Sequence, residues 1–308
     1  MTVPKRLISR PDPKVTDVVI VGCGPAGMAA AIQLKRAGLE PVVFEKGKVG
    51  GLLVNAHLVE NYPGFPEGIS GVDLVALMRR HLTVLGIEVV FEKVTMVDVE
   101  HDRFLVRAGG SDTRSMSLII ASGTRPNMLA SVPIPRGLSD RVTYEIDPIR
   151  SVRGKAIAIV GAGDAAFDYA LSLGKHNDVT ILSRGYEPRC LPLLSERAAM
   201  SPRISFVPET EVTAIEGADG PRLALGCRNP GGALEIVADH LVIAIGRYPD
   251  LGFMSQQSAG TGAIRQGEGF LHLIGDVSHG SMRQTAIAVG DGMVAAMVIA
   301  GKLREIGR

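Results

Sequence analysis

Cysteine and aromatic residues are scarce in this chain of 308 residues, and tryptophan is absent. The three cysteines, Cys23, Cys190 and Cys227, are far apart in the sequence. Cysteines at such spacings provide neither the framework of a secreted disulfide-bonded protein nor the ligand cluster of a zinc site. We therefore expect neither kind of site, and no bound metal.

The chain also lacks an excess of charge of one sign and a long apolar run. Its 33 basic residues nearly balance its 32 acidic residues, so no broad electrostatic field attracts nucleic acid or an anionic membrane. No apolar run reaches the roughly 18 to 20 residues of a membrane span. The first residues, MTVPKRLISRPDPK, lack the apolar centre of a signal peptide. We expect residues 1–15 to be a flexible arm and the protein to be cytoplasmic.

Glycine, by contrast, is abundant, with 37 residues, as in α/β proteins with many tight turns. After the β-branched run DVVIV, Gly22, Gly24 and Gly27 give the G-x-G-x-x-G spacing. A helix that ends near Gly38 and a strand that ends in Glu45 are predicted next. Such a turn brings the backbone close to a pyrophosphate, and the helix N-terminus attracts the phosphate charge. Glu45 is placed to accept hydrogen bonds from a ribose diol.

The same pattern occurs a second time, after the apolar run KAIAIV. Gly161, Gly163 and Ala166 form the second turn, and the helix that follows is predicted to end near Gly174. The next predicted strand is DVTIL. The sequence therefore predicts a second nucleotide site.

The residue that follows the second strand differs between the two sites. Glu45 lies 23 residues after Gly22, and Arg184 lies 23 residues after Gly161. An acid at this place suits a free ribose, whereas an arginine suits a ribose 2′-phosphate. Arg189, five residues further on, is a candidate for a second phosphate contact. We expect the first nucleotide to have free ribose hydroxyls and the second to be phosphorylated.

The repetition divides the chain into two similar parts. After each βαβ start comes a run of short alternating strands, which ends in an apolar strand and a glycine, SLIIASG and HLVIAIG. A last strand, FLHLIGD, and a helix within SMRQTAIAVGDGMVAAMVIAGKL are predicted to return to the first part. The predicted fold class is α/β with two Rossmann-like domains, a discontinuous one of residues 16–125 and 247–308 and an inserted one of residues 126–246.

At these motifs the sequence resembles the low-molecular-weight thioredoxin reductase family, over nearly the whole chain. The matching pieces are GCGPAG, GG at 50–51, VENYPGFPEGISG, ASG, GAGDAA, AIGRYPD and GDVSHGSMRQTAIAVGDGMVAAM. The resemblance implies that the discontinuous domain binds FAD without a covalent link and that the inserted domain binds NADPH. It also implies a homodimer in which hydride passes from the nicotinamide to the flavin.

The resemblance assigns the cofactor contacts residue by residue. For FAD they are Gly22, Gly24, Pro25, Ala26, Gly27, Glu45, Lys46, Gly51, Asn61, Val94, Ser122, Gly123, Gly275, Asp276, Arg283, Gln284 and Thr285. For NADPH they are Gly161, Gly163, Asp164, Ala165, Arg184, Arg189 and Gly246. Gly51 and Asn61 are expected near the flavin, and Gly275 and Asp276 at the ribityl–pyrophosphate portion. Arg283 and Gln284 are expected to begin the last helix, whose N-terminus stabilises negative charge on the reduced flavin.

Two departures from the family pattern change the expected function. The family's C-x-x-C pair is replaced by Glu145, Ile146, Asp147 and Pro148. The flavin is then the redox centre, and no side chain of this chain is expected to be catalytic. The family's adjacent arginine pair is reduced to SRG, so Gly185 weakens the preference for NADPH and NADH is a possible donor.

The identity of the acceptor stays open at this point. The prediction is an FAD-dependent NAD(P)H oxidoreductase that passes electrons to an external acceptor, which could be a ferredoxin- or flavodoxin-like protein, a quinone or another small molecule. The thioredoxin-reductase-like ferredoxin/flavodoxin–NADP reductases also lack the cysteine pair, and GAGDAAFDYAL resembles them. Disulfide reduction through the flavin alone or with one cysteine is a further alternative. An idle FAD-binding sensor or assembly protein is another.

Overall fold

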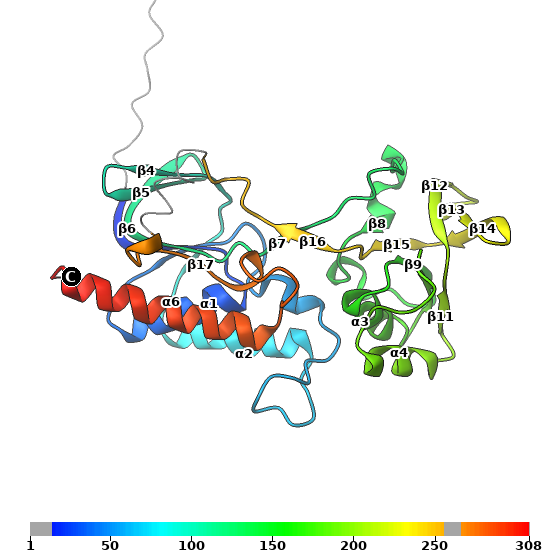
Figure 1. The fold of residues 1–308 in the computed structure, drawn as a ribbon, viewed down its shortest axis with the longest axis horizontal. Helices are drawn as coiled ribbons and strands as arrows, with labels where there is room; N and C mark the ends of the chain where they lie inside the picture. Colours follow the sequence, from blue (N-terminus) through cyan, green and yellow to red (C-terminus); the bar gives the residue numbers. More distant parts are fainter. Residues whose placement is uncertain (1–13, 256–265, 308) are drawn as a thin grey trace, which may run out of the picture. The chain divides into compact units, whose positions relative to one another are not determined.

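The computed structural model describes residues 14–255 and 266–307, and it divides them into two compact units (Figure 1). The first unit contains the described residues up to Leu53, together with Val75–Thr124 and those from Pro249 onward. The second unit contains Val54–Leu74 and Arg125–Tyr248. Residues 1–13 of the expected N-terminal arm lie outside the described residues, whereas Lys14 and Val15 belong to the first strand.

The first unit is built on a seven-stranded sheet. The strand order is β3-β2-β1-β6-β5-β4, and β17 pairs with β6. The strands are β1 (Lys14–Val21), β2 (Val42–Phe44), β3 (Val89–Val90), β4 (Val94–Glu100), β5 (Arg103–Ala108), β6 (Ser111–Ile120) and β17 (Leu271–Leu273). β1 is parallel to β2 and β6, and β17 is parallel to β6, whereas β4, β5 and β6 form an antiparallel meander. The last strand therefore returns to the first unit, as the sequence predicted.

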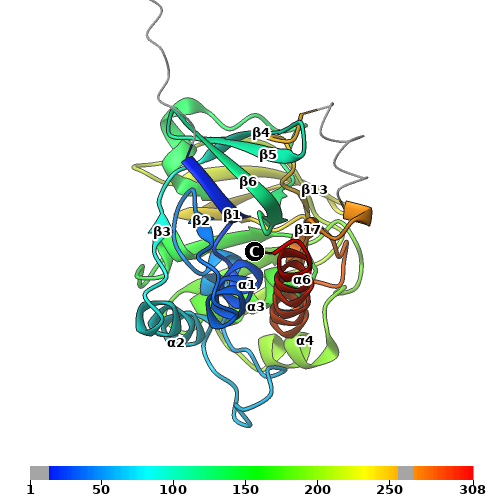
Figure 2. The same ribbon diagram turned by 90° about the vertical axis from the view of Figure 1, so that its left-hand side faces the viewer.

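Alternate residues of β1 enter two different cores, because successive side chains of a strand point to opposite faces. Val18 and Ile20 pack with the helices α1 (Pro25–Arg36) and α6 (Thr285–Glu305), together with residues of α2 (Gly71–Val84). Val19 and Val21 pack with the meander on the other face. Figure 2 shows α1 and α6 side by side beneath the sheet.

Helix α6 differs from the expectation that no part of the chain is as long and apolar as a membrane span. Among the described residues it is the one helix whose length and composition would allow it to cross a membrane, but core helices of globular proteins meet the same criteria. α6 packs closely along α1, since a Cβ on Gly292 would lie 2.3 Å from the carbonyl oxygen of Ala26. We therefore describe α6 as a core helix of the first unit.

The second unit repeats this plan with a five-stranded sheet of order β11-β10-β9-β15-β8. The strands are β8 (Val142–Thr143), β9 (Ala156–Val160), β10 (Asp178–Leu182), β11 (Ile204–Val207) and β15 (His240–Ile243). All neighbours in this sheet are parallel. A separate antiparallel sheet contains β12 (Glu211–Gly217), β13 (Leu223–Asn229) and β14 (Gly232–Ala238).

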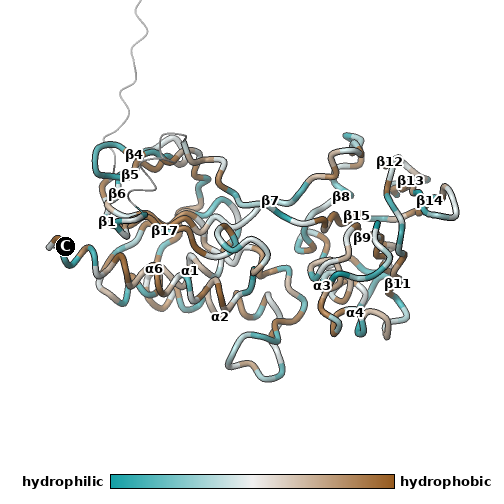
Figure 3. Tube along the Cα trace, in the orientation of Figure 1, coloured by the Kyte–Doolittle hydropathy of each residue, from teal (hydrophilic) through white to brown (hydrophobic). Residues whose placement is uncertain are grey.

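The central strand β9 again divides its side chains between two cores. Ile157 and Ile159 pack with the helices α3 (Asp164–Leu173) and α4 (Pro192–Ala199). Ala158 and Val160 pack with the three-stranded sheet. Figure 3 shows apolar residues concentrated on the central strands within each unit. The two connections between the units, β7 (Thr124–Pro126) and β16 (Arg247–Pro249), pair with each other.

Candidate nucleotide-binding sites

The first glycine turn is held against the sheet by contacts that leave no room for a side chain. Gly22 has φ +104°, and a Cβ there would lie 2.3 Å from the carbonyl oxygen of Ala121. A Cβ on Gly27 would lie 2.0 Å from the carbonyl oxygen of Gly22. These two glycines therefore allow close packing of β1, α1 and the end of β6.

Gly24 differs from its two neighbours because it faces open space. It is the N-cap residue of α1, and a Cβ there would meet no atom closer than the Cα of Gly51, at 3.9 Å. No side chain caps this helix and no acidic residue lies in its first turn, where Pro25 and Ala26 follow the cap. A helix N-terminus of this kind binds phosphate groups. The residues present therefore fit a pyrophosphate.

Glu45 lies beside this turn and is almost fully buried, with 8% of its surface exposed. Its Oε2 accepts a hydrogen bond from the backbone N–H of Cys23 at 2.8 Å, and its Oε1 accepts one from Gly47 at 2.9 Å. A carboxylate oxygen has two acceptor positions. Glu45 can therefore hold the turn and still accept hydrogen bonds from a ribose.

Asp250 links Lys46, which follows β2, to the loop that follows β6. Asp250, which is buried, lies 2.6 Å from Nζ of Lys46. The backbone N–H of Asp250 donates to the carbonyl oxygen of Gly123, and its own carbonyl accepts from the Ser122 hydroxyl. Three of the expected FAD contacts are thus connected through Asp250, which the sequence analysis did not select.

The turn after β17 has a similar anchor on α6. The turn begins at Gly275, at the start of the short helix η4 (Gly275–Val277), and Asp276 follows in its first turn. The backbone N–H of Gly275 donates to Oδ2 of Asp291 at 2.8 Å. The same oxygen lies 2.7 Å from Nε2 of His279. Asp291 and His279 were also missed, because nothing in the local sequence links them to Gly275.

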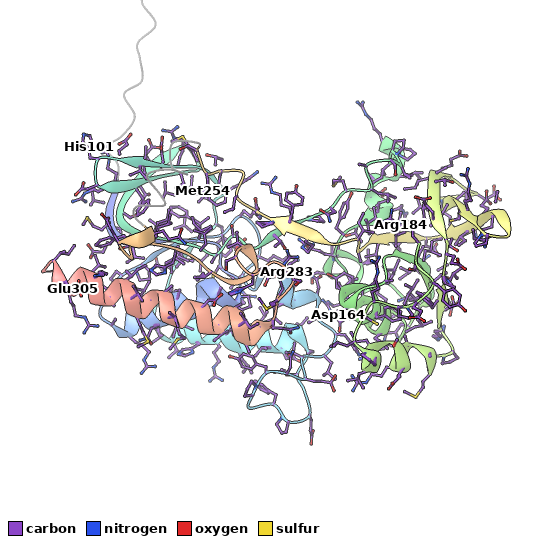
Figure 4. The ribbon with its side chains drawn as sticks, viewed as in Figure 1. His101, Asp164, Arg184, Met254, Arg283 and Glu305 are labelled. Atoms are coloured by element: carbon purple, nitrogen blue, oxygen red, sulfur yellow. The ribbon has the colours of Figure 1, made fainter. Side chains whose placement is uncertain are left out.

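The remaining expected FAD contacts lie in different settings. α6 begins at Thr285 with Gln284 as its N-cap, so Arg283 precedes the helix and does not begin it (Figure 4). Val94 is buried in the apolar core on the meander side of the sheet. Asn61 is exposed and lies in the segment Val54–Leu74, which packs with the second unit.

The second glycine turn has the same close contact as the first. Gly161 has φ +140°, and a Cβ there would lie 2.2 Å from the carbonyl oxygen of Ala244. Ala166, in place of a third glycine, is fully buried. Gly163 is the N-cap of α3, and a Cβ there would meet nothing within 4 Å. This turn therefore also offers an open helix N-terminus, at which Ala165 is exposed.

The loop after β10 folds back onto this second turn. The backbone N–H of Arg189 donates to the carbonyl oxygen of Ala162 at 2.7 Å. Oδ1 of Asp164 accepts a hydrogen bond from the backbone N–H of Leu191 at 2.8 Å. The side chains of Arg184 and Arg189 are exposed on this loop, and Figure 4 shows Arg184 and Asp164 on the second unit.

Gly246 lies at the end of the second unit, where the chain leaves toward β16. It has φ +97°, and a Cβ there would lie 3.1 Å from Nδ2 of Asn127. Its carbonyl oxygen accepts a hydrogen bond from the backbone N–H of Asn127 at 3.0 Å. Gly246 therefore has a conformational role whether or not it contacts a nucleotide.

The tract that replaces the cysteine pair binds the segment Val54–Leu74 inside the second unit. The backbone N–H of Asp147 donates to Oδ1 of Asn55 at 2.9 Å. The guanidinium of Arg150 donates to the carbonyl oxygen of Val54. Further along the segment, both carboxylate oxygens of Glu60 accept from Arg197, at 2.6 and 2.9 Å.

Asp168 on α3 receives the same segment. One of its oxygens accepts a hydrogen bond from the backbone N–H of His57 at 2.8 Å. Burial raises the pKa of the Asp168 carboxyl to about 6, although hydrogen bonds from the backbone of His57 and Leu58 and the charge of Arg150 act in the opposite direction. The folded protein thus contains a carboxyl group that titrates close to neutral pH.

None of the three cysteines is paired. Cys23 is fully buried, and burial together with the charge of Glu45 raises the pKa of its thiol to about 12. Cys190 and Cys227 belong to two different cores of the second unit, and burial raises the pKa of each thiol. A thiol with a raised pKa is a poor nucleophile, because the thiolate is the reactive form.

Comparisons with known proteins agree with this architecture. The model of the family described as pyridine nucleotide-disulphide oxidoreductase matches residues 16–292. The chain is 32% identical over 301 residues to a thioredoxin reductase of Streptomyces clavuligerus, covering 92% of each chain. It is 30% identical over 311 residues to a thioredoxin reductase of Bacillus subtilis, covering 95% of this chain and 96% of the relative.

A solved structure shows the same fold. The crystal structure of Lactococcus lactis thioredoxin reductase in its FR conformation superposes with a TM-score of 0.83 at 29% identity, covering 94% of this chain and 99% of that one. This chain therefore has two Rossmann-like sheets and two glycine turns, and it matches these proteins in sequence and fold over most of its length. The chain therefore belongs to the pyridine nucleotide-disulphide oxidoreductase family and, within it, to the low-molecular-weight thioredoxin reductases, which are flavoprotein oxidoreductases that use NAD(P)H.

Proposed function

We propose that this protein is an FAD-dependent NADPH oxidoreductase that passes electrons from the flavin directly to an external acceptor. The observation that carries the proposal is the combination of two open glycine turns with three cysteines that are unpaired and belong to separate cores. Residues 16–125 and 247–308 are proposed to bind FAD, and residues 126–246 to bind NADPH.

The first unit supplies binding and orientation rather than chemistry. The N-terminus of α1 binds the pyrophosphate, Glu45 accepts from the adenosine ribose, and the turn at Gly275 and Asp276 holds the ribityl–pyrophosphate portion. When bound, FAD supplies the hydride acceptor that no side chain of this chain provides. The N-terminus of α6, near Arg283, stabilises negative charge.

The second unit selects the donor. The N-terminus of α3 binds the pyrophosphate of NADPH, and Arg184 pairs with the 2′-phosphate, with Arg189 as a further contact. Exposure of both arginines next to the turn supports this assignment. Gly185 stands where the family has a second adjacent arginine, so NADH is a weaker alternative donor.

The acceptor is proposed to be a ferredoxin- or flavodoxin-like protein, a quinone or another small molecule. Reduction of a protein disulfide requires a nucleophilic thiolate, and preferably a second thiol to resolve the mixed disulfide. The tract from Glu145 to Pro148 has no sulfur. Asp147 in this tract and Arg150 just after it bind the segment Val54–Leu74. A ferredoxin/flavodoxin–NADP reductase is thus one form of the proposed function.

The decisive experiment compares acceptors. With NADPH as donor, we expect the FAD-loaded protein to reduce ferricyanide or a quinone and not to reduce thioredoxin. A variant with all three cysteines replaced by serine should behave identically. Thioredoxin turnover that is lost in this variant would overturn the proposal. Failure of NADPH to bleach the flavin absorbance under anaerobic conditions would instead indicate an idle FAD-binding protein.

FAD retention is tested separately. We expect FAD to co-purify without a covalent link, and Glu45→Arg to weaken its retention by removing a ribose acceptor and adding a cation. A colourless wild type that cannot be reconstituted with FAD would refute the assignment of the first unit.

We also propose a cytoplasmic homodimer. The dimer is supported by an exposed apolar face on α6, which contains Ile287, Val294, Met297 and Val298. These positions share one face of the helix because their spacing follows the helical repeat. Exposed apolar patches of this kind occur at protein interfaces.

A further inference from the structure

One carboxylate on α6 holds both ends of the turn that follows β17. Oδ2 of Asp291 accepts a hydrogen bond from the backbone N–H of Gly275 at 2.8 Å. The same oxygen lies 2.7 Å from Nε2 of His279, which is four residues after Gly275. The carboxylate therefore connects the start of the turn, the end of the turn and the core helix.

Other contacts also restrict the conformation of this turn. Gly275 has φ +70°, and a Cβ there would lie 2.9 Å from the Cβ of Ala26, in the first turn of α1. The backbone N–H and the hydroxyl of Ser278 both donate to the carbonyl oxygen of Gly275, at 3.0 and 2.9 Å. Asp291 thus fixes the direction of the Gly275 N–H and, with it, the place of Asp276.

We propose that Asp291, oriented by His279, is a positioning residue for the FAD-binding turn at Gly275 and Asp276. This inference rests on the proposed binding of FAD by the first unit. Asp291 acts through the turn and not by touching the cofactor. A binding turn that is already ordered raises affinity, because binding then costs less conformational entropy. A carboxylate orders it well, since its hydrogen bonds are charge-assisted.

The test measures the dissociation constant of FAD by titrating the apoprotein and following flavin fluorescence. Asp291→Ala removes the acceptor of the Gly275 N–H and the partner of His279, so we expect a rise on the order of 10-fold or more. Asp291→Asn keeps an acceptor oxygen in place, and we expect its dissociation constant to stay within about 3-fold of wild type. His279→Gln, which retains a donor, should fall between these two.

The matched control is Glu305→Ala. Glu305 is a carboxylate on the same helix, paired with Lys302 at 3.0 Å, at the far end from the turn (Figure 4). The unfolding midpoints of all the apoproteins are compared as well, to detect loss of the fold. The visible circular dichroism spectrum of bound FAD should change in Asp291→Ala and return toward wild type in Asp291→Asn.

Two sets of results would overturn the inference. If Asp291→Ala binds FAD as tightly as Glu305→Ala, or if Asp291→Asn binds it as weakly as Asp291→Ala, then the hydrogen bond to Gly275 does not position the site. In both cases the proposed function stands, because wild type still binds FAD. A wild type that binds no FAD would refute the proposed function and the inference together.

Discussion

Glu45 and Arg184 occupy equivalent places after the second strand of each unit, yet their surroundings differ. Glu45 is buried and its two oxygens accept backbone hydrogen bonds from Cys23 and Gly47. Arg184 is exposed, next to buried Ser183. Glu45 therefore shapes its turn in addition to the ribose contact that we propose for it, whereas the role proposed for Arg184 is ligand binding alone.

This difference predicts a clean effect of Arg184→Ala. A charge-assisted contact to a 2′-phosphate contributes about 1.5 to 3 kcal/mol, or on the order of 10- to 150-fold in affinity. The Michaelis constant should rise by this factor for NADPH and stay nearly unchanged for NADH. Arg228→Ala, at an exposed arginine on β13, is the control. Equal effects of Arg184→Ala on both donors would show that the arginine does not recognise the phosphate.

The glycines of the first turn predict two distinguishable defects. Alanine at Gly27 places a Cβ 2.0 Å from a backbone oxygen, so Gly27→Ala should lower the unfolding midpoint of the apoprotein. Alanine at Gly24 meets no atom closer than 3.9 Å, so Gly24→Ala should fold normally and bind FAD more weakly. Thermal unfolding of the apoproteins and FAD titration separate the two effects. Normal FAD binding by Gly24→Ala would contradict the placement of the pyrophosphate.

At the scale of elements, the segment Val54–Leu74 packs in a different unit from the residues that precede and follow it in the sequence. It lies between two parts of the first unit in the chain, yet it packs with η3 (Asp147–Ile149), α3 and α4 of the second unit. These contacts use backbone groups and side chains about 90 to 140 residues away. The tract at the place of the family's cysteine pair therefore has a structural partner in this segment.

Asp168 makes this contact dependent on pH. Its folded-state pKa of about 6 lies above the ordinary value of 3.8, so the folded state binds its proton more tightly than the unfolded state. The carboxyl therefore lowers stability as pH rises from about 4 to about 6, in total by on the order of 3 kcal/mol. Relative to wild type, Asp168→Asn should gain stability as the pH is raised from 4 to 7.

Thermal unfolding across this pH range measures the effect. Asp178→Asn, which changes an exposed carboxylate on β10, is the control and should show no comparable gain. A difference between Asp168→Asn and wild type that is the same at pH 4 and pH 7 would contradict the assignment of the raised pKa.

For the whole molecule, the sequence predicted what is local and missed what is assembled from distant parts. The two βαβ units, the glycine turns and the strand ends at Glu45 and Arg184 follow from short patterns with a fixed geometry. Lys46 and Asp250 are 204 residues apart in the sequence, so no periodicity or local motif predicts their contact. The sequence analysis missed Asp291 for a related reason. Which residue of α6 lies beside the turn at Gly275 depends on how the helix packs against the sheet.

The apolar face of α6 predicts the oligomeric state. Val294 and Met297 are 62% and 59% exposed, and we propose that a second copy of the chain covers them. The double variant Val294→Lys/Met297→Lys should be a monomer by light scattering and still bind FAD, whereas wild type should be a dimer. Val84→Lys, at an exposed apolar residue at the end of α2, is the control. A monomeric wild type would contradict the proposal.

The burial of the thiols predicts how this protein responds to inhibitors that react with thiols. Trivalent arsenicals inhibit by bridging two neighbouring thiols, and alkylating drugs or peroxides attack thiolates. Cys23 is fully buried with a pKa of about 12, Cys227 is buried and Cys190 is half-buried, and no two of these thiols are paired. None offers the reactive pair that these agents trap. If electrons leave directly from the flavin, as we propose, we expect this protein to stay active in an oxidising or electrophile-rich environment that blocks a dithiol route.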